Sequence, residues 1–283
     1  MIKLVISGGD SFTYGAELAD DHEAGLPRPS EVSWANLVAN KLDTKHINTS
    51  ESGRSNDFIV RQVINTIYEA LQHDYNSDEI FVQIMWTFNS RTEICVDFDI
   101  ERRDSPWLPI DSHMIMDESK SDWFKELDPK TTIHWKEIRD VMHERWEKNK
   151  RLDVVNYASE YYKLASHTQH TYNTLKHILM LQDFLTVRNI KYMFTYVNEH
   201  VMYGLVGYES KYTKVLHNFI KFNEWYKFPG IYDKEFVGFD DWAKANGYSY
   251  ATSHPLEQAH KDAAELLYEK ARQIITGGVG PLP

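Results

Sequence analysis

Two deficits of this sequence, in cysteine and in positive charge, exclude several classes of protein at the outset. The chain has 283 residues and one cysteine, Cys95, so it can form neither an intrachain disulfide nor a zinc site made of cysteines. Its 31 Lys and Arg residues are outnumbered by 42 Asp and Glu residues, which leaves a formal net charge of −11. Because nucleic-acid binders rely on basic surfaces to neutralise phosphates, we expect no nucleic acid among the partners.

Long apolar runs are absent as well. No stretch approaches the roughly 18 consecutive apolar residues of a membrane-spanning helix, so we expect no membrane partner. The apolar run at the N-terminus, residues 2–7, is too short for a secretory signal peptide and leads directly into Gly8-Gly9. Together with the low cysteine content, these features predict a soluble, cytoplasmic protein.

Strand-like and helix-like patterns alternate along much of the chain. Short apolar runs predict strands at residues 2–7, 45–48, 80–86 and 191–197. Apolar residues at helical spacing predict helices at residues 33–42, 55–71 with Ser55 as the N-cap, 136–150, 156–188, 240–246 and 255–275. This alternation favours a parallel sheet that is covered on both faces and binds ligands at the carboxyl ends of its strands. The Gly- and Pro-rich tail, residues 277–283, is expected to be disordered.

Aromatic residues are abundant, at 13% of the chain, and are unevenly placed. The charged segment at residues 97–153 holds four of the eight tryptophans, and residues 198–238 are also rich in aromatic side chains. We predict that both segments are insertions that cover the carboxyl edge of the sheet, the first as a lid, and line the site with aromatic rings. The alternatives for these rings are a second small core or an oligomer contact.

A serine follows the first predicted strand at once. In Gly8-Gly9-Asp10-Ser11, two glycines permit a tight turn that would place Ser11 at the carboxyl edge of the sheet. A serine hydroxyl there can act as a nucleophile if a histidine takes its proton and nearby donors hold the oxyanion. The alternative is that Ser11 only caps the helix that follows.

A histidine stands near the other end of the chain in a matching position. His254-Pro255 immediately precedes the last predicted helix, so His254 is expected in a loop at the same edge, where it can face Ser11. The combination of an early Gly-Asp-Ser and a late His-Pro, separated by almost the whole chain, resembles the SGNH or GDSL family of serine hydrolases.

This resemblance implies a fold and a set of site residues. The fold would be a flavodoxin-like α/β class, a three-layer α/β/α sandwich with a central parallel sheet, formed as one domain by residues 1–283 and interrupted by the two aromatic-rich insertions. The likeness covers residues 1–96, 154–197 and 239–275. It implies that Ser11 is the nucleophile and an oxyanion-hole donor, that the backbone N–H of Gly53 is a second donor, and that His254 is the general base.

The third sequence block departs from the family's usual Gly-x-Asn-Asp. The chain has Thr87-Phe88-Asn89-Ser90 after the third predicted strand. Asn89 keeps the asparagine whose side-chain amide would be the third oxyanion donor, although the hydroxyl of Thr87 could take that place. Thr87, Asn56 and Arg91 are also candidate substrate-binding residues, the alternative for Arg91 being an exposed structural arginine.

The last block departs more seriously. The family's pattern is Asp-x-x-His, in which the aspartate orients the imidazole, but Ala251 stands three residues before His254. Two readings stay open. Either a backbone carbonyl holds the imidazole of a Ser-His dyad, or an acid comes from elsewhere in the chain, for which the sequence offers Asp240, Asp241 and Glu199.

The function that these features favour is that of a serine ester hydrolase. O-acetyl groups on a carbohydrate are the first substrate to consider, because tryptophan faces stack on sugar rings. A non-catalytic binding module on the same fold and an O-acyltransferase are the alternatives. We expect no metal and no cofactor: His167, His170 and His177 lack the neighbouring glutamate of zinc proteases, and Gly-x-Gly-x-x-Gly is absent. The oligomeric state stays open.

Overall fold

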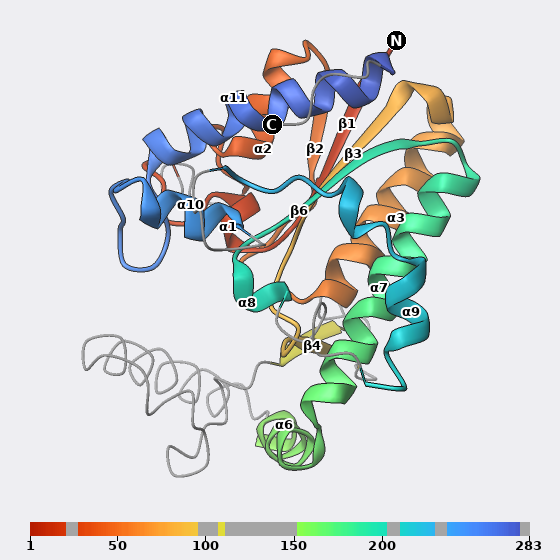
Figure 1. Cartoon of the computed structure of the whole chain (residues 1–283), viewed down its shortest axis with the longest axis vertical. Coiled ribbons are helices and arrows are strands. Elements are labelled where there is room, and N and C mark those ends of the chain that lie inside the picture. The colour runs from red at the N-terminus through yellow and green to blue at the C-terminus, as the bar shows by residue number, and fades with distance from the viewer. Residues whose placement is uncertain (21–27, 96–106, 111–151, 203–209, 230–236, 278–283) are drawn as a thin grey trace. The chain divides into compact units, whose positions relative to one another are not determined.

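A parallel four-stranded sheet forms the centre of the structure. The computed structural model describes residues 1–20, 28–95, 107–110, 152–202, 210–229 and 237–277. Strands β1 (Leu4–Gly8), β2 (Lys45–Asn48), β3 (Ile80–Trp86) and β6 (Lys191–Tyr196) pair in parallel in the order β2-β1-β3-β6 (Figure 1). The sequence predicted all four strands with closely similar bounds.

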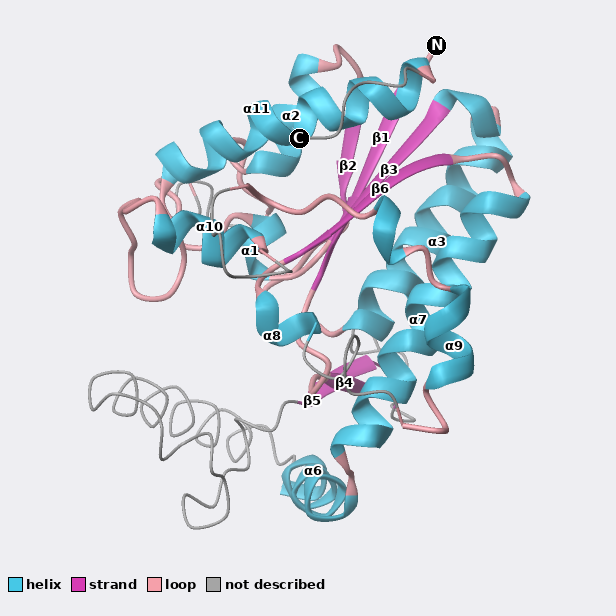
Figure 2. Ribbon diagram, in the orientation of Figure 1, coloured by secondary structure: helices cyan, strands magenta, loops and turns pink. Residues whose placement is uncertain are grey.

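Helices cover both faces of this sheet. Figure 2 shows α2 (Trp34–Lys41) and α11 (Glu257–Thr276) on one side of it and α3 (Asn56–His73) and α7 (His167–Val187) on the other. Their apolar faces share one core with the strands, in which every residue of β3 is buried. The fold is therefore the three-layer α/β/α sandwich that the sequence predicted.

The side chains of β1 show how its two faces are used, since successive residues of a strand point to opposite sides. Ser7 Oγ accepts a hydrogen bond from Gln83 Nε2 at 2.8 Å, and the same amide donates to the carbonyl of Ala35 in α2 at 2.9 Å. Gly8 faces α3, where a Cβ in its place would lie 2.7 Å from Val63 Cγ2. A side chain at position 8 would thus push α3 away from the sheet.

The strand order determines where a ligand-binding crevice is expected at the edge of the sheet. The chain passes from β1 to β2 on one side of it and then to β3 on the other side. The carboxyl ends of β1 and β3 therefore flank a topological switch point, where open α/β sheets bind their ligands. Ser11 lies in the turn of chain that follows β1, and Thr87 directly follows β3.

One predicted helix is divided in two. The apolar periodicity predicted a continuous helix over residues 156–188, but the structure has α6 (Leu152–Leu164) and α7, which begins at His167. Ser166 ends the continuity because its side chain accepts a hydrogen bond from the Gln169 backbone at 3.2 Å, as an N-cap residue does.

The remaining elements are short, and part of the prediction lies outside the described residues. Residues 1–89 and 171–283 form one compact unit, and residues 90–170 form another. The predicted helix at 136–150, most of the insertion at 97–153 and most of the tail at 277–283 lie outside the described residues. The further helices and strands are α1 (Ser11–Tyr14), the antiparallel pair β4 (Thr92–Cys95) and β5 (Trp107–Ile110), α8 (Glu199–Met202), α9 (Lys214–Phe219), α10 (Phe239–Ala245), and two 3₁₀ turns, Ser77–Glu79 and Phe222–Glu224.

The described part of the second insertion, residues 198–238, belongs to the main core. Trp225 and Phe228 are buried, and the Trp225 ring stacks on that of Trp86 at a centroid distance of 6.3 Å. Trp225 therefore packs against β3, and Phe228 packs against Phe239 and Trp242 of α10. These two rings belong to the core and not to the site lining expected for this segment. Their large apolar surface explains the burial.

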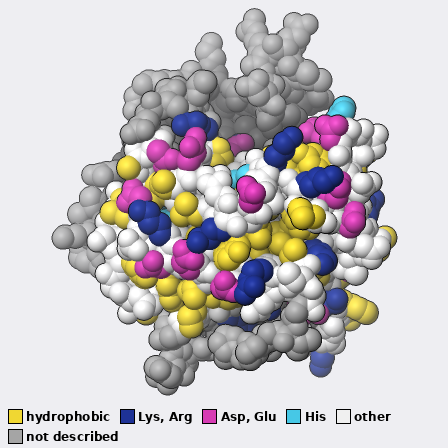
Figure 3. Space-filling model, turned by 90° about the horizontal axis from the view of Figure 1, so that it is seen from above, with side chains coloured by type: hydrophobic (Ala, Val, Ile, Leu, Met, Phe, Trp, Pro, Cys, Tyr) yellow, Lys and Arg dark blue, Asp and Glu magenta, His cyan; other side chains and the backbone are white. Residues whose placement is uncertain are grey.

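The surface carries mixed charge. On the face drawn in Figure 3, basic and acidic side chains are interspersed among polar ones and are not gathered by sign. Within the described ranges, the helices are too short or too polar to cross a membrane.

Two histidines are held inside the fold without charge. The buried ring of His260 accepts a hydrogen bond at Nδ1 from the Trp34 backbone at 3.1 Å, which satisfies the first N–H of α2. Burial, with a contribution from nearby His254, lowers the pKa of His260 to about 3. His46 lies between Ser7 Oγ at 2.7 Å and Asn36 Oδ1 at 2.9 Å, and burial lowers its pKa to about 4.

We expect these histidines to weaken the fold in mild acid. Below the ordinary histidine pKa of about 6.5, His260 and His46 become protonated in the unfolded chain but stay neutral in the folded protein. The free energy of unfolding should therefore fall as the pH drops from about 6.5 toward 4, by up to about 1.4 kcal/mol per pH unit for each histidine. Urea denaturation at a series of pH values measures this slope. A His260→Gln variant with the same slope as the wild type would contradict the assignment.

Candidate active site

Ser11 is the first residue of α1, at the carboxyl edge of β1. Asp10, and not Ser11, is the N-cap of this helix, because its Oδ1 accepts a hydrogen bond from the Phe12 backbone at 3.1 Å. The alternative that Ser11 only caps a helix is therefore wrong. Ser11 is buried, with 7% of the residue exposed.

The two glycines before Ser11 serve close packing. Neither Gly8 nor Gly9 has the positive φ that distinguishes Gly15, so the tight turn does not need their conformational freedom. A Cβ at Gly9 would overlap the side chain of Thr13 in the next turn of chain. Glycine at position 9 thus allows α1 to begin immediately after β1.

A buried hydrogen-bonded group fixes the base of the site. Thr87 Oγ1 donates to Asp10 Oδ2 at 2.6 Å, which ties the end of β3 to the turn that carries Ser11. Asn56, the first residue of α3, accepts from the Thr87 backbone N–H at 3.0 Å and donates to the Thr87 carbonyl at 2.9 Å. Thr87 and Asn56 are buried, and these hydrogen bonds give them a bracing function. The substrate contacts predicted for them stay predictions.

His254 reaches the same edge from the last loop of the chain. A bridge between Tyr250 and Pro255 and a hydrogen bond from the Ala251 N–H to the His254 carbonyl, at 3.0 Å, close this loop into a tight turn. Nε2 of His254 lies 2.8 Å from Ser11 Oγ. The imidazole also packs on the Phe12 ring, with a centroid distance of 4.7 Å.

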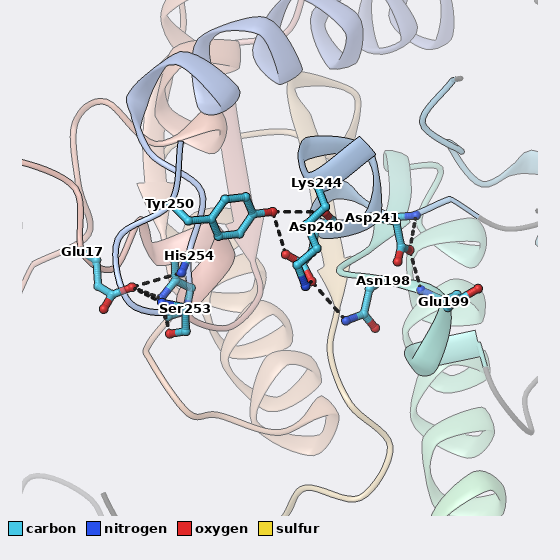
Figure 4. Close-up of polar contacts among 10 residues, drawn as sticks. Glu17, Asn198, Glu199, Asp240, Asp241, Lys244, Tyr250, Ser253 and His254 are labelled. Carbon is cyan, nitrogen blue, oxygen red and sulfur yellow. Dashed lines mark hydrogen bonds and ion pairs between the residues drawn. The ribbon is translucent and has the colours of Figure 1, made fainter. Parts of the chain in front are cut away.

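A carboxylate occupies the other nitrogen of the imidazole, and it is Glu17. Figure 4 shows this side chain beside His254 and Ser253, with Oε2 2.8 Å from His254 Nδ1. The same oxygen accepts from the Ser253 and His254 backbone N–H groups, each at 3.0 Å. Burial opposes ionisation of Glu17, but the Ser253 N–H and His254 outweigh it and lower the pKa of this carboxyl to about 2.

The three acids suggested by the sequence have other partners. Asp240 binds Lys244 Nζ at 2.8 Å and accepts from the Tyr250 hydroxyl at 2.9 Å (Figure 4). Asp241 accepts from the backbone N–H of Glu199 at 2.7 Å and so connects α10 to α8. The expectation that one of these acids orients His254 is wrong. No spacing in the sequence pointed to Glu17, which lies 237 residues before the histidine.

The contacts of Gly53, Asn89 and Arg91 do not test the functions predicted for them. Gly53 lies in an exposed turn with a φ of +75°, a conformation that glycine adopts readily. Asn89 is half-buried after β3, and Arg91 belongs to the separate unit at residues 90–170. The oxyanion functions of Gly53 and Asn89 and the substrate contact of Arg91 stay predictions.

In the described part of the chain, no group of three or more His, Cys, Asp and Glu side chains is placed to hold a metal ion.

Comparisons with known proteins place the chain near a family without an assigned function. A model of a family of unknown function, DUF6071, matches residues 16–155. No curated protein matches.

Two solved structures are similar to the chain at low identity. One is a carbohydrate esterase whose active site is described as having divergent catalytic and non-catalytic binding functions, at a TM-score of 0.43 and 12% identity. The other is an acetyl xylan esterase from the rumen bacterium Butyrivibrio proteoclasticus, at a TM-score of 0.42 and 14% identity. Each similarity covers 96% of this chain but only 65% and 63%, respectively, of the two esterases. The proposals below therefore rest on the geometry of this chain.

The bracing function of Thr87 can be measured by removing its hydroxyl. Thr87→Val keeps the shape of the side chain but leaves the buried Asp10 carboxylate without this donor, so it should lower the free energy of unfolding by about 1–3 kcal/mol. Thr87→Ser retains the hydroxyl and should lose less. Equal stabilities of the two variants in urea denaturation would show that the Thr87–Asp10 hydrogen bond is not what holds the turn.

Proposed function

We propose that the protein is a serine ester hydrolase in which Ser11 is the nucleophile and His254 the general base. The observation that carries this proposal is the 2.8 Å distance between Ser11 Oγ and His254 Nε2. A serine hydroxyl is a weak nucleophile until a neighbouring base accepts its proton, and this distance is within hydrogen-bond reach.

The position of Ser11 supports the same function. It lies at the switch point of a parallel sheet, where substrates of such folds are bound. Hydrogen bonds among Asp10, Thr87 and Asn56 connect the turn that carries Ser11 to the end of β3 and the start of α3. These contacts fix the position of the turn, and with it that of the hydroxyl.

The reaction follows in two halves that balance. Ser11 Oγ forms a bond to the acyl carbon while its proton passes to His254 Nε2, and the tetrahedral intermediate collapses as Nε2 returns that proton to the departing alcohol oxygen. Water then attacks the acyl-serine and gives a proton to Nε2. Collapse of the second intermediate returns the proton to Ser11 Oγ and releases the carboxylic acid.

The oxyanion of both intermediates needs donors. We assign this function to the backbone N–H groups of Ser11 and Gly53 and to the side-chain amide of Asn89. The N–H of Ser11 is in the first turn of α1, where backbone donors have no partner within the helix. Gly53 and Asn89 follow β2 and β3, respectively, at the same edge of the sheet.

The substrate we propose is a small acyl ester, with O-acetyl groups on a carbohydrate as the first to test. The net charge of −11 disfavours polyanionic substrates. The four tryptophans of residues 97–153 supply rings of the kind that stack on sugars.

A fluorophosphonate probe tests the nucleophile directly. Intact-mass measurement should show one adduct on the wild-type protein and none on Ser11→Ala, and His254→Ala should react far more slowly. Hydrolysis of p-nitrophenyl acetate should fall by at least about a thousandfold in both variants.

A neighbouring serine supplies the control for this experiment. Ser253→Ala removes the other hydroxyl beside the imidazole, 3.1 Å from Nδ1, and should keep the adduct. A folded wild-type protein that takes no label, or a Ser11→Ala variant that still does, would contradict the proposed function and favour a binding module. Transfer of the acyl group to added alcohols in preference to water would identify an acyltransferase.

A further inference from the structure

We propose that Glu17 is the positioning residue for His254: it orients the imidazole and balances its positive charge once the ring has taken the proton of Ser11. This inference rests on the proposed function and adds to it a residue that the sequence did not reveal. The general base would then be held by a carboxylate supplied by the loop that follows the nucleophile's own helix.

The contacts of one carboxylate oxygen carry the argument. Glu17 Oε2 accepts from the backbone N–H of Ser253 and of His254 at 3.0 Å each, and lies 2.8 Å from His254 Nδ1. It therefore binds both the main chain and the ring of the same histidine. The ring cannot rotate about its side-chain bonds without losing the Nδ1 contact, so Nε2 stays directed at Ser11 Oγ.

The loop of His254 does not supply an acid of its own. Ala251 is exposed, and its backbone N–H closes the turn by donating to the His254 carbonyl at 3.0 Å. The Ser253 hydroxyl, at 3.1 Å, is the other oxygen near Nδ1, and it carries no charge. Among the described residues, Glu17 thus supplies the carboxylate at Nδ1 of the imidazole.

The charge state of the surroundings fits this function. The pKa of Glu17 is lowered to about 2, so the carboxylate is ionised in neutral solution. Burial lowers the pKa of nearby His260 to about 3, so this ring is uncharged in neutral solution. An imidazolium formed at His254 during the reaction would therefore meet the negative charge of Glu17 and an uncharged His260.

The backbone of Glu17 is held in a conformation that glutamate rarely adopts. Its φ is +67°, in the left-handed region, where a residue with a side chain is uncommon. Such conformations persist when surrounding contacts fix them, and they concentrate at functional sites. Here the fixing contacts are those of the Glu17 carboxylate with the backbone N–H groups of Ser253 and His254.

Two glutamates therefore connect the same two segments in opposite directions. Glu17 reaches from the loop after α1 to Ser253 and His254, and Glu257 reaches back from α11 to Ala19. Of these two glutamates, Glu17 contacts the imidazole, at Nδ1, whereas the contact of Glu257 is with the Ala19 backbone. This difference separates positioning of the base from simple attachment of the two loops.

The experiment compares Glu17→Gln with Glu257→Gln in the full chain, with p-nitrophenyl acetate as the substrate. Glu17→Gln keeps the side-chain length but removes the charge, and should lower kcat/KM by about 10²- to 10⁴-fold, with the loss in kcat and little change in KM. Glu257→Gln removes the charge of the other connecting side chain and should stay within a few-fold of the wild type.

The pH profile supplies a readout that mere attachment would not move. An anion beside the imidazole favours its protonated form, so the pH at which kcat/KM reaches half its plateau should be lower in Glu17→Gln and unchanged in Glu257→Gln. Glu17→Asp keeps the charge, so it should keep the pH midpoint of kcat/KM of the wild type while its kcat is reduced. If Glu17→Gln fails to fold, Glu17→Asp is the variant that tests the function of Glu17.

The outcomes separate this inference from the proposed function. Wild-type kcat/KM and pH midpoint in folded Glu17→Gln, or equal losses in the two glutamine variants, would overturn the role of Glu17. If Glu17→Gln does not fold, a kcat in Glu17→Asp equal to that of the wild type would also overturn the role of Glu17. In each case, loss of the fluorophosphonate adduct in Ser11→Ala would leave the proposed function standing.

Discussion

The parallel pairing of β1 with β2 on one side and with β3 on the other is the constraint on which the rest of the structure depends. It places β1 inside the sheet, so that both faces are buried and the turn after it opens at the switch point. Ser11 lies there because Gly8 and Gly9 leave no side chain between the strand, α3 and the start of α1. The location of the candidate nucleophile is thus a consequence of how the sheet is built.

Polar groups from distant parts of the chain complete the site. Below the turn, Thr87 and Asp10 join the ends of β3 and β1. Above it, His254 meets Ser11 across 243 residues of sequence, and Glu17 meets His254 across 237. Neither pair would form if α11 packed in another register against α2, so the contact of those two helices sets the geometry of the base. Buried His260, which accepts from the first N–H of α2, is part of that contact.

The scaffold was predictable because its signals are local. Apolar runs identified the four strands, and Ser55 was correctly expected to cap α3, where its side chain accepts from the Phe58 backbone. The division between α6 and α7 was missed because apolar periodicity continues across Ser166, whose hydroxyl accepts from the Gln169 N–H and so caps the start of α7. The aromatic residues Trp225 and Phe228 were assigned to a site lining because composition does not distinguish a core ring from an exposed one.

The site could be predicted only where residue type and position agree. Ser11 and His254 each follow or precede a recognisable element, which made their meeting at one edge foreseeable. Sequence reasoning did not find the acid because it favoured carboxylates after β6 and in α10. Of these, Asp240 binds Lys244 and Tyr250, and Asp241 accepts from the Glu199 backbone N–H. Glu17 depends on a left-handed backbone and on a loop contact with Ser253, neither of which leaves a pattern in the sequence.

The central claim is that His254 accepts the proton of Ser11 at Nε2, and the ring tautomer tests it most directly. Nitrogen-15 NMR of histidine-labelled protein at neutral pH, with His254→Ala to assign the signal, distinguishes the two neutral tautomers. We expect a proton on Nδ1, directed at Glu17, and an unprotonated Nε2 facing Ser11. A neutral ring with its proton on Nε2 would donate to Ser11 instead of accepting from it, and would rule out His254 as the base.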